Sequence, residues 1–237
     1  MHQVLDVEAP MKLSSTTRRS VAPAWHTILV LIVIEASAVR GLLRTSQIGA
    51  GLNLDRITLY ERTLLFEWLL LGLVLFGVWL KGGSLFEVLG DRWRSGEQIL
   101  RDVGLAVAFL IASIMITSMI GGHGGDANKS IQFLLPQTGA ERALWVLLSI
   151  SAGICEEAVY RGYFQKQFMA LTNSVPAGIG LAALTFAGSH LYQGWAHAAV
   201  IGVMAVLGGV LAHWCRSVRP GMIAHVMQDV LGGFVQH

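Results

Sequence analysis

Ionisable residues inside apolar stretches are the first candidates for chemistry in this chain, and they gather in its second half. Three come from one stretch and three from the two that follow: Glu156, Glu157, Arg161, His190, His225 and Asp229. A charged side chain at the centre of a bilayer costs roughly 2.5–3.5 kcal/mol on insertion scales, so each one needs a partner or a function. We therefore expect these side chains to meet in one buried site that carries out hydrolysis.

Helical spacing gives the first three residues different roles. A helix turns by about 100° per residue, so positions four apart share a face. Glu157 and Arg161 are such a pair, and we interpret them as a structural ion pair that offsets part of the cost of burial. Glu156 lies about 100° around the helix and has no basic residue three or four positions further on. It is the candidate general base for water, and the alternative is a carboxyl buried in its protonated form.

The two histidines follow the same spacing. His190 comes four residues after Phe186, and His225 comes four residues before Asp229. The second pair could be a histidine oriented by an acid, or two ligands of a metal ion. His190 alone would fit an interfacial or core position equally well. The recurrence of polar groups in three consecutive apolar regions favours one shared site.

Composition indicates an integral membrane protein. Of the 237 residues, 54% are hydrophobic and only 14% are charged, whereas soluble domains have about 25% charged residues. A net charge of +2 and the lack of a basic stripe with aromatic residues argue against a nucleic-acid partner. Residues 1–23 form a polar N-terminal tail, and residues 24–237 form a single transmembrane helical domain whose motif-bearing core spans about 100–236.

Apolar segments long enough to cross the membrane recur along the domain. Each has about the length that a helix needs to cross ~30 Å of hydrocarbon, and a spanning backbone must satisfy its own hydrogen bonds. We predict an all-α integral membrane bundle of about seven to eight transmembrane helices. Residues 44–61 and 82–101, which connect segments, could each include a short interfacial helix. The predicted segments are 24–43, 62–80, 102–120, 142–160, 176–193, 196–215 and 220–236.

The basic residues predict the orientation. With the N-terminus inside and seven spans, the inner side receives 11 of the 17 Lys and Arg residues, as the positive-inside rule requires. We predict a multi-pass protein of the cell membrane with a cytoplasmic N-terminus. If a helical hairpin turns on the cytosolic side near residues 162–180, Glu156 and His190 both lie roughly 21–22 Å from that turn. The site would then line a polar cavity open to the cytoplasmic side.

Three motifs resemble one family. Glu156 to Arg161 read E-E-x-x-x-R, Phe186 to His190 read F-x-x-x-H, and His225 to Asp229 read H-x-x-x-D. In this order, and each in an apolar segment, they resemble the CPBP family of intramembrane proteases (CAAX protease and bacteriocin-processing, also called Abi or Rce1-like). The resemblance covers about residues 100–236. The family accepts Asn or Asp at the last motif position, and Asp229 adds a charge and a possible metal ligand.

The resemblance implies an intramembrane endopeptidase that cleaves near the membrane-anchored end of a protein or peptide substrate. By this comparison, Glu156 would activate the attacking water with the help of His190. His225 and Asp229 would position the water or bind the oxyanion. Glu157 and Arg161 would hold the helix and shape the substrate groove. The expected partners are a membrane-associated substrate and the lipid bilayer, while the oligomeric state and prenylation of the substrate are open.

The sequence leaves open whether the site binds a metal ion, and it allows two functions other than proteolysis. His190, His225 and Asp229 would suit a three-ligand zinc site with one open position, but no H-E-x-x-H pair is present, so a metal-free site is equally open. The first alternative function is a non-catalytic membrane immunity or binding protein on the same scaffold. The second is a haem-binding membrane subunit that uses paired histidines, for which His197 and His213 are the available side chains.

Overall fold

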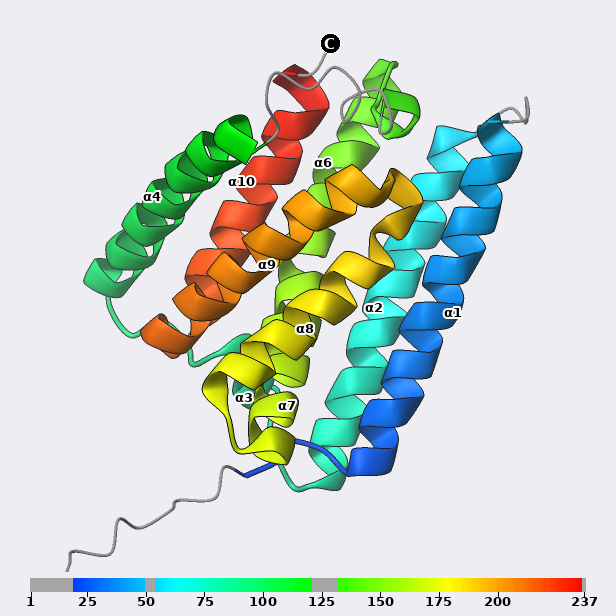
Figure 1. Cartoon of the computed structure of the whole chain (residues 1–237). Coiled ribbons are helices and arrows are strands. Elements are labelled where there is room, and N and C mark those ends of the chain that lie inside the picture. The colour runs from blue at the N-terminus through cyan, green and yellow to red at the C-terminus, as the bar shows by residue number, and fades with distance from the viewer. Residues whose placement is uncertain (1–18, 50–53, 121–131, 236–237) are drawn as a thin grey trace, which may run out of the picture.

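The computed structural model describes residues 19–49, 54–120 and 132–235, and within these ranges every regular element is a helix (Figure 1). The predicted polar tail therefore lies, up to residue 18, outside the described residues. Each of the seven predicted apolar segments falls mainly on one long helix, which confirms the all-α prediction. These long helices are α1 (Ala24–Gly49), α2 (Arg56–Leu80), α4 (Gly96–Ile120), the composite helix Gly139–Thr172, α8 (Val175–Ser189), α9 (Trp195–Cys215) and α10 (Arg219–Val235). The segment 176–193 runs past the end of its helix at Ser189, and residue 236 lies outside the described residues.

The composite helix changes type along its length. It begins as α6 (Gly139–Glu156), continues as the π-helix η2 (Glu157–Phe164) and ends as α7 (Gln165–Thr172). Three short helices lie in connections: α3 (Phe86–Leu89), η1 (Gln132–Leu134) and η3 (Leu191–Gln193). The π-helix coincides with the E-E-x-x-x-R motif, so the local backbone differs from a regular α-helix where the candidate chemistry lies.

Local sequence sets the ends of the helices around this hairpin. The side chain of Thr138 accepts from the backbone N–H of Glu141, whose own side chain accepts from the backbone of Thr138 in return, and this capping box begins α6. Asn173 adopts the left-handed conformation (φ 51°) that commonly ends a helix. Ser174 then caps α8, and Pro176 stands in its first turn. A two-residue turn therefore joins α7 to α8, within residues 162–180, where the sequence predicts a hairpin.

Length and composition make several of these helices candidate spans. Five described helices are long and apolar enough to cross a membrane: Ala24–Gln47, Arg56–Leu80, Gly96–Met119, Gly139–Thr172 and Trp195–Cys215. α8 is a shorter apolar helix of 15 residues, and α10 has 17 residues. The protein is thus a multi-span helical membrane bundle. Its predicted orientation, and the opening of its polar site to the cytoplasm, stay predictions.

Of the two connecting segments in which we predict a short helix, one contains it and the other does not. The segment 82–101 contains the short helix α3, as predicted. The prediction of a separate short helix within 44–61 is wrong for the described residues, because α1 continues to Gly49 and α2 already begins at Arg56. The side chain of Asp55 accepts from the backbone N–H of Thr58 and caps α2. Helical hydrogen bonding therefore extends both long helices beyond their apolar parts.

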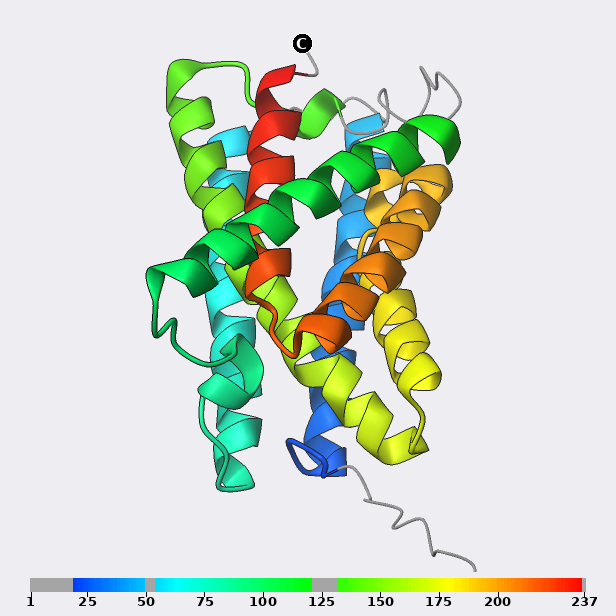
Figure 2. The same cartoon turned by 90° about the vertical axis from the view of Figure 1, so that its left-hand side faces the viewer.

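The packing of the helices brings the motif segments together. α6 contacts both α2 and α10, α8 contacts α7 and α9, and α4 crosses obliquely over α10 and touches α9 (Figure 2). Gly153 allows α6 and α10 to approach closely, because a Cβ atom there would lie 2.4 Å from Val226 and 3.0 Å from the carbonyl oxygen of Met222. Small residues commonly permit such contacts between membrane helices. This contact places the end of α6 beside the middle of α10.

A buried polar cluster joins the beginning of α1 to the π-helix and α7. His26 is fully buried, its Nε2–H donates to the carbonyl oxygen of Leu73 (3.0 Å), and its Nδ1 accepts from the hydroxyl of Tyr163 (2.8 Å). Gln167, also fully buried, accepts from the N–H of Ala22 (3.2 Å) and donates to the carbonyl oxygen of the same residue (2.9 Å). The hydrogen-bonding groups of these two side chains are therefore matched within the described structure.

Candidate active site

The two motif glutamates stand where the composite helix changes type. Glu156 is the last residue of α6, and Glu157 is the first residue of the π-helix η2, which is buried along its whole length. Its backbone makes wider i→i+5 hydrogen bonds, as from the N–H of Gln165 to the carbonyl oxygen of Tyr160. Such segments are rare and are frequently found at functional sites. The backbone is therefore unusual at the very residues that the sequence selects for chemistry.

Glu157 and Arg161 form the predicted ion pair. Arg161 Nη1 lies 3.0 Å from Glu157 Oε1, and both side chains are about 95% buried, with relative exposures of 6% and 5%. The guanidinium carbon of Arg161 also lies 4.6 Å from the ring centroid of Phe186 on α8, a cation–π contact. The prediction of a structural pair is confirmed. The pair also ties the π-helix to α8.

His225 of α10 lies between carboxylates from two helices. Its Nδ1 is 3.3 Å from Glu157 Oε1, while its Nε2 is 3.7 Å from Glu156 Oε2 and 3.5 Å from Asp229 Oδ2. The contact with Asp229 confirms that this histidine and acid share one face. The two carboxylates at Nε2 are at or beyond the limit of a hydrogen bond. The imidazole is thus hydrogen-bonded to Glu157 through Nδ1, whereas its Nε2 has carboxylates nearby but no short hydrogen bond.

His190 ends α8 with one ring nitrogen committed and one free. Nδ1 lies 2.8 Å from the carbonyl oxygen of Phe186 and 3.1 Å from Ser189 Oγ. A carbonyl oxygen only accepts, so Nδ1 carries the proton, and in the neutral ring Nε2 keeps its lone pair. Among the described residues, Nε2 has no hydrogen-bond partner. The fold therefore presents His190 in the tautomer that suits a proton acceptor.

Phe186 explains why the second motif begins with an aromatic residue. Its ring centroid lies 4.5 Å from that of His190, 6.3 Å from that of His225 and 4.7 Å from that of Tyr160. The hydroxyl of Tyr160 in turn donates to Ser189 Oγ at 3.1 Å. Phe186 is therefore the apolar wall that both histidines contact. It brings His190 to the cluster, in which the other predicted site residues touch one another directly.

Sequence reasoning missed one acidic residue, Glu67 of α2. It is 6% exposed, it accepts a hydrogen bond from Ser151 Oγ at 2.6 Å, and it interacts electrostatically with Glu156 and His225. The available signal was a lone carboxylate inside an apolar run, which carries the same burial cost as Glu156. It was missed because it has no polar partner one turn away, and Ser151 lies 84 positions further along the chain.

The predicted zinc ligands do not form a ready metal site in this structure. Among the described residues, no group of three or more His, Cys, Asp or Glu side chains is arranged to hold a metal ion. Nδ1 of His190 is engaged by a backbone carbonyl and Nδ1 of His225 by Glu157, which leaves Nε2 of each ring as the nitrogen that would bind a metal ion. Zinc held by His190, His225 and Asp229 stays a prediction, and the chemistry below uses protein side chains alone.

Comparison with known families agrees with the motifs. Residues 138–231 match the model of the Rce1-like family, described as type II CAAX prenyl endopeptidase. The match runs from Thr138, which caps α6, into α10, so it includes every predicted site residue but not Glu67. A search of curated proteins and a search of solved structures each gave no match. The resemblance is confirmed: residues 138–231 of this membrane protein are similar to the Rce1-like family, whose description names the predicted class of reaction.

Proposed function

We propose that the protein is an intramembrane endopeptidase in which Glu156 activates water for attack on a peptide bond. The observation that carries this proposal is the position of His225, whose Nε2 lies 3.7 Å from Glu156 Oε2 and 3.5 Å from Asp229 Oδ2 in the interior of a membrane protein. A site built only for stability would pair these groups by short hydrogen bonds, as happens around His26. Their loose pairing leaves polar atoms for a water molecule and a substrate.

The first step is addition of water. Glu156 accepts a proton from a water molecule, with the free Nε2 of His190 as a second acceptor, while the water oxygen bonds to the carbonyl carbon of the scissile peptide. The carbonyl π electrons move to oxygen and create an oxyanion. His225 faces carboxylates at both ring nitrogens and acts as the doubly protonated imidazolium, so its Nε2–H, on the open side of the cluster, donates a hydrogen bond to that oxyanion.

The second step is loss of the amine. The oxyanion re-forms the carbonyl, the carbon–nitrogen bond breaks with its electrons on nitrogen, and Glu156 returns its proton to that nitrogen. The products are one carboxylic acid and one amine, so atoms and charge balance. General acid–base help of this kind contributes typically about 10²–10⁴-fold to a rate.

The remaining polar residues position the reacting groups. Glu157 links Arg161 to Nδ1 of His225, at 3.0 Å and 3.3 Å, and so orients the imidazole. Asp229 supplies a second carboxylate on the opposite side of that ring. Gly221 leaves space for Glu157, because a Cβ atom there would lie 2.7 Å from its Oε2. A carboxylate–imidazole contact of this kind fixes the ring's orientation and proton position.

A prenylated CAAX end is the first substrate to test, because the family description names that class. Such an end is anchored in the bilayer next to the bond to be cut. A substrate of this kind suits a site formed by helices of a membrane bundle. A peptide leader or another anchored protein is the second choice, and an unprenylated peptide of the same sequence separates the two.

The central experiment replaces Glu156 with Gln. Purified protein is incubated with a prenylated CAAX peptide, and the released C-terminal fragment is measured by mass spectrometry. We expect turnover to fall by about 10²–10⁴-fold, because Gln cannot accept the proton from water. The matched control is Glu61→Gln, which removes an exposed carboxylate from α2 and should keep full activity.

The same variant separates catalysis from binding. Loss of cleavage with normal helicity and abundance supports the endopeptidase. If Glu156→Gln cleaves as fast as the wild type, the proposed role of Glu156 is wrong. If no cleavage occurs with the wild type while Glu156→Gln keeps its biological activity, the non-catalytic immunity or binding function takes its place.

Metal analysis decides between hydrolysis by protein side chains alone and hydrolysis assisted by zinc. We expect active protein to retain cleavage after treatment with a chelator, since the side chains alone supply a base and an oxyanion donor. Elemental analysis of the same sample measures zinc directly. Stoichiometric zinc whose removal abolishes cleavage would instead support the site made of His190, His225 and Asp229.

A further inference from the structure

A basic pocket lies where the segment before α4 meets the connection between α9 and α10, and none of the predicted site residues lines it. It has a volume of about 310 Å³, and the charged side chains that line it are Asp91, Arg92, Arg94, Arg216 and Arg219. They come from the segment before α4 and from the connection between α9 and α10. The pocket therefore holds four guanidinium groups and one carboxylate, a clear excess of positive charge.

One of these arginines is fixed by the structure. Arg219 Nε lies 3.0 Å from Oδ2 of the fully buried Asp102, and its guanidinium carbon lies 5.2 Å from the ring centroid of Trp93. Asp102 is shared, since Arg101 lies 2.8 Å from its Oδ1 and the indole N–H of Trp93 donates to its Oδ2. Asp102 thus holds Arg219 in place but is already engaged by two arginines.

The other three arginines are exposed and available. Within the described ranges, the side chains of Arg92, Arg94 and Arg216 make no ion pair or hydrogen bond, although Arg92 stacks over Phe86 at 5.1 Å. The first turns of α4 and α10 also border the pocket through Gln98 and Arg219. The N–H groups of Gln98 and Arg219 already donate to Ser95 Oγ and Ser217 Oγ, so these helix starts add only the positive end of their dipoles to the arginine charge.

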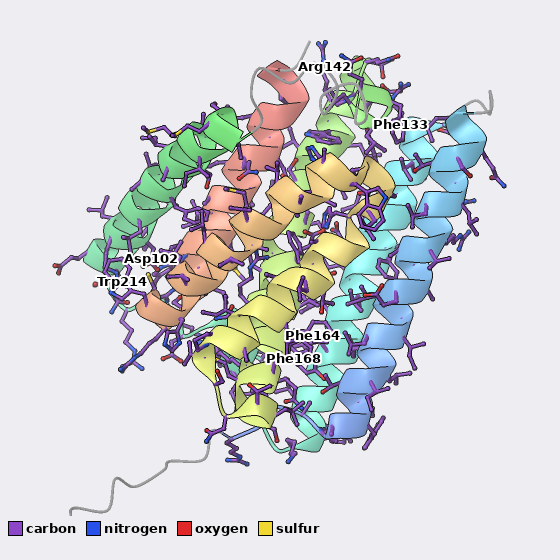
Figure 3. The ribbon with its side chains drawn as sticks, in the orientation of Figure 1. Asp102, Phe133, Arg142, Phe164, Phe168 and Trp214 are labelled. Carbon is purple, nitrogen blue, oxygen red and sulfur yellow. The ribbon has the colours of Figure 1, made fainter. Side chains whose placement is uncertain are left out.

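The position of the pocket indicates where its ligand comes from. The candidate span of α9 ends at Cys215 and that of α4 begins at Gly96, so the pocket opens where hydrocarbon gives way to lipid headgroups. Trp214 is 74% exposed, and exposed Trp residues favour this boundary. In Figure 3, Asp102 and Trp214 lie together at the side of the bundle, near the start of α4 and well below Arg142.

We propose that this pocket binds the phosphate group of an anionic phospholipid. Arginine guanidinium groups match phosphate oxygens in geometry and charge, and three of them are free to do so. A lipid phosphate lies at the right depth, whereas a soluble phosphate would have no reason to prefer this position. Arg219 begins the helix that carries His225, so the bound lipid also braces the start of α10.

The test measures lipid binding by the full chain in a neutral detergent. Phosphatidylglycerol, phosphatidylcholine and inorganic phosphate are the probes, and native mass spectrometry gives the bound fraction in a titration. We expect the wild type to prefer phosphatidylglycerol by roughly tenfold or more, because each basic residue near an anionic headgroup adds to the attraction. Replacing Arg92, Arg94 and Arg216 together with Gln should abolish this preference.

The matched control removes the same charge at the other end of the bundle. Arg40, Arg62 and Arg142 are exposed there, and their joint replacement with Gln should leave the preference unchanged. Equal binding of the two lipids by the wild type overturns the proposal, and so does a preference that survives loss of the three pocket arginines. Binding of inorganic phosphate without any lipid preference would assign the pocket to a free phosphate and likewise overturn it.

A single substitution keeps the test valid if the triple variant does not fold. Circular dichroism and gel filtration show whether it does. Arg216 is exposed and follows the last residue of α9, so Arg216→Gln should keep the fold and weaken phosphatidylglycerol binding severalfold. An unchanged affinity in this folded variant counts against the proposal.

Discussion

Two buried polar clusters in this bundle differ in how completely their groups are paired. Around His26, both ring nitrogens have partners at 2.8–3.0 Å. Around His225, the ring faces carboxylates at 3.3–3.7 Å, and Nε2 of the neighbouring His190 has no partner among the described residues. The first cluster joins the beginning of α1 to the π-helix, while the second lies where the three motifs meet.

This difference separates a structural histidine from a candidate catalytic one. A buried polar group without a partner costs about 1–3 kcal/mol, so folding alone favours the arrangement around His26. An incompletely paired cluster persists when the surrounding packing holds it in place, as the close contact of α6 and α10 at Gly153 does here. Pairing, rather than burial alone, therefore distinguishes the two sites.

The sharpest test of the comparison is His190→Ala. We expect turnover to fall by about 10²–10⁴-fold, because the variant loses the free imidazole nitrogen that serves as the second proton acceptor. Stability should change little, since His190 is only partly buried and its ring bonds one backbone carbonyl. Peptide cleavage and thermal unfolding measure the two effects. If His190→Ala instead lowers stability and keeps full activity per folded molecule, His190 is a structural residue like His26.

The next largest effect is expected on stability, from Glu157→Ala. This change leaves Arg161 buried without its counter-charge, which costs about 3–5 kcal/mol. Adding Arg161→Met should recover part of the loss, because no charge is then left unpaired. Unfolding in a mixed-micelle titration measures both variants. Additive losses in the double variant would show that the two residues do not act as a pair.

A smaller loss of stability is expected for His26→Phe. The change keeps an aromatic ring but leaves the hydroxyl of Tyr163 and the carbonyl oxygen of Leu73 without this partner, at about 1–3 kcal/mol. Activity per folded molecule should equal that of the wild type. The same unfolding and cleavage assays apply, and a selective loss of activity would remove the distinction between the two clusters.

The smallest expected effect is a change of activity in Glu67→Gln. The amide oxygen can still accept the hydrogen bond from Ser151, but the carboxyl group, which interacts electrostatically with Glu156, is lost. Because Glu67 affects only the surroundings of the reacting groups, we expect turnover to fall by about tenfold at most, or ~1.4 kcal/mol. Cleavage rates measured beside Glu61→Gln check this. Equal rates in the two variants would make Glu67 a structural residue.

Much of the fold and part of the candidate site could be predicted from the sequence, because these features depend on local geometry. Apolar length gave the seven long helical segments, and the spacing of four gave the contacts of Glu157 with Arg161 and of His225 with Asp229. The turn between α7 and α8 also followed from residues near Ser174. The connection 44–61 was predicted incorrectly because hydropathy marks where hydrocarbon ends, whereas hydrogen bonding and caps decide where a helix ends.

The amino-acid sequence by itself determined that this is a helical membrane protein with three motif-bearing segments, because composition and helical periodicity act within a few turns of chain. Only the tertiary structure decided that His225 lies between carboxylates of two helices, that Glu67 joins them, and that arginines from two distant segments line one pocket. The physical reason is that these contacts depend on how helices pack. Close approaches such as that at Gly153 set this packing. A local sequence pattern does not indicate which residue of another helix will lie opposite a given side chain.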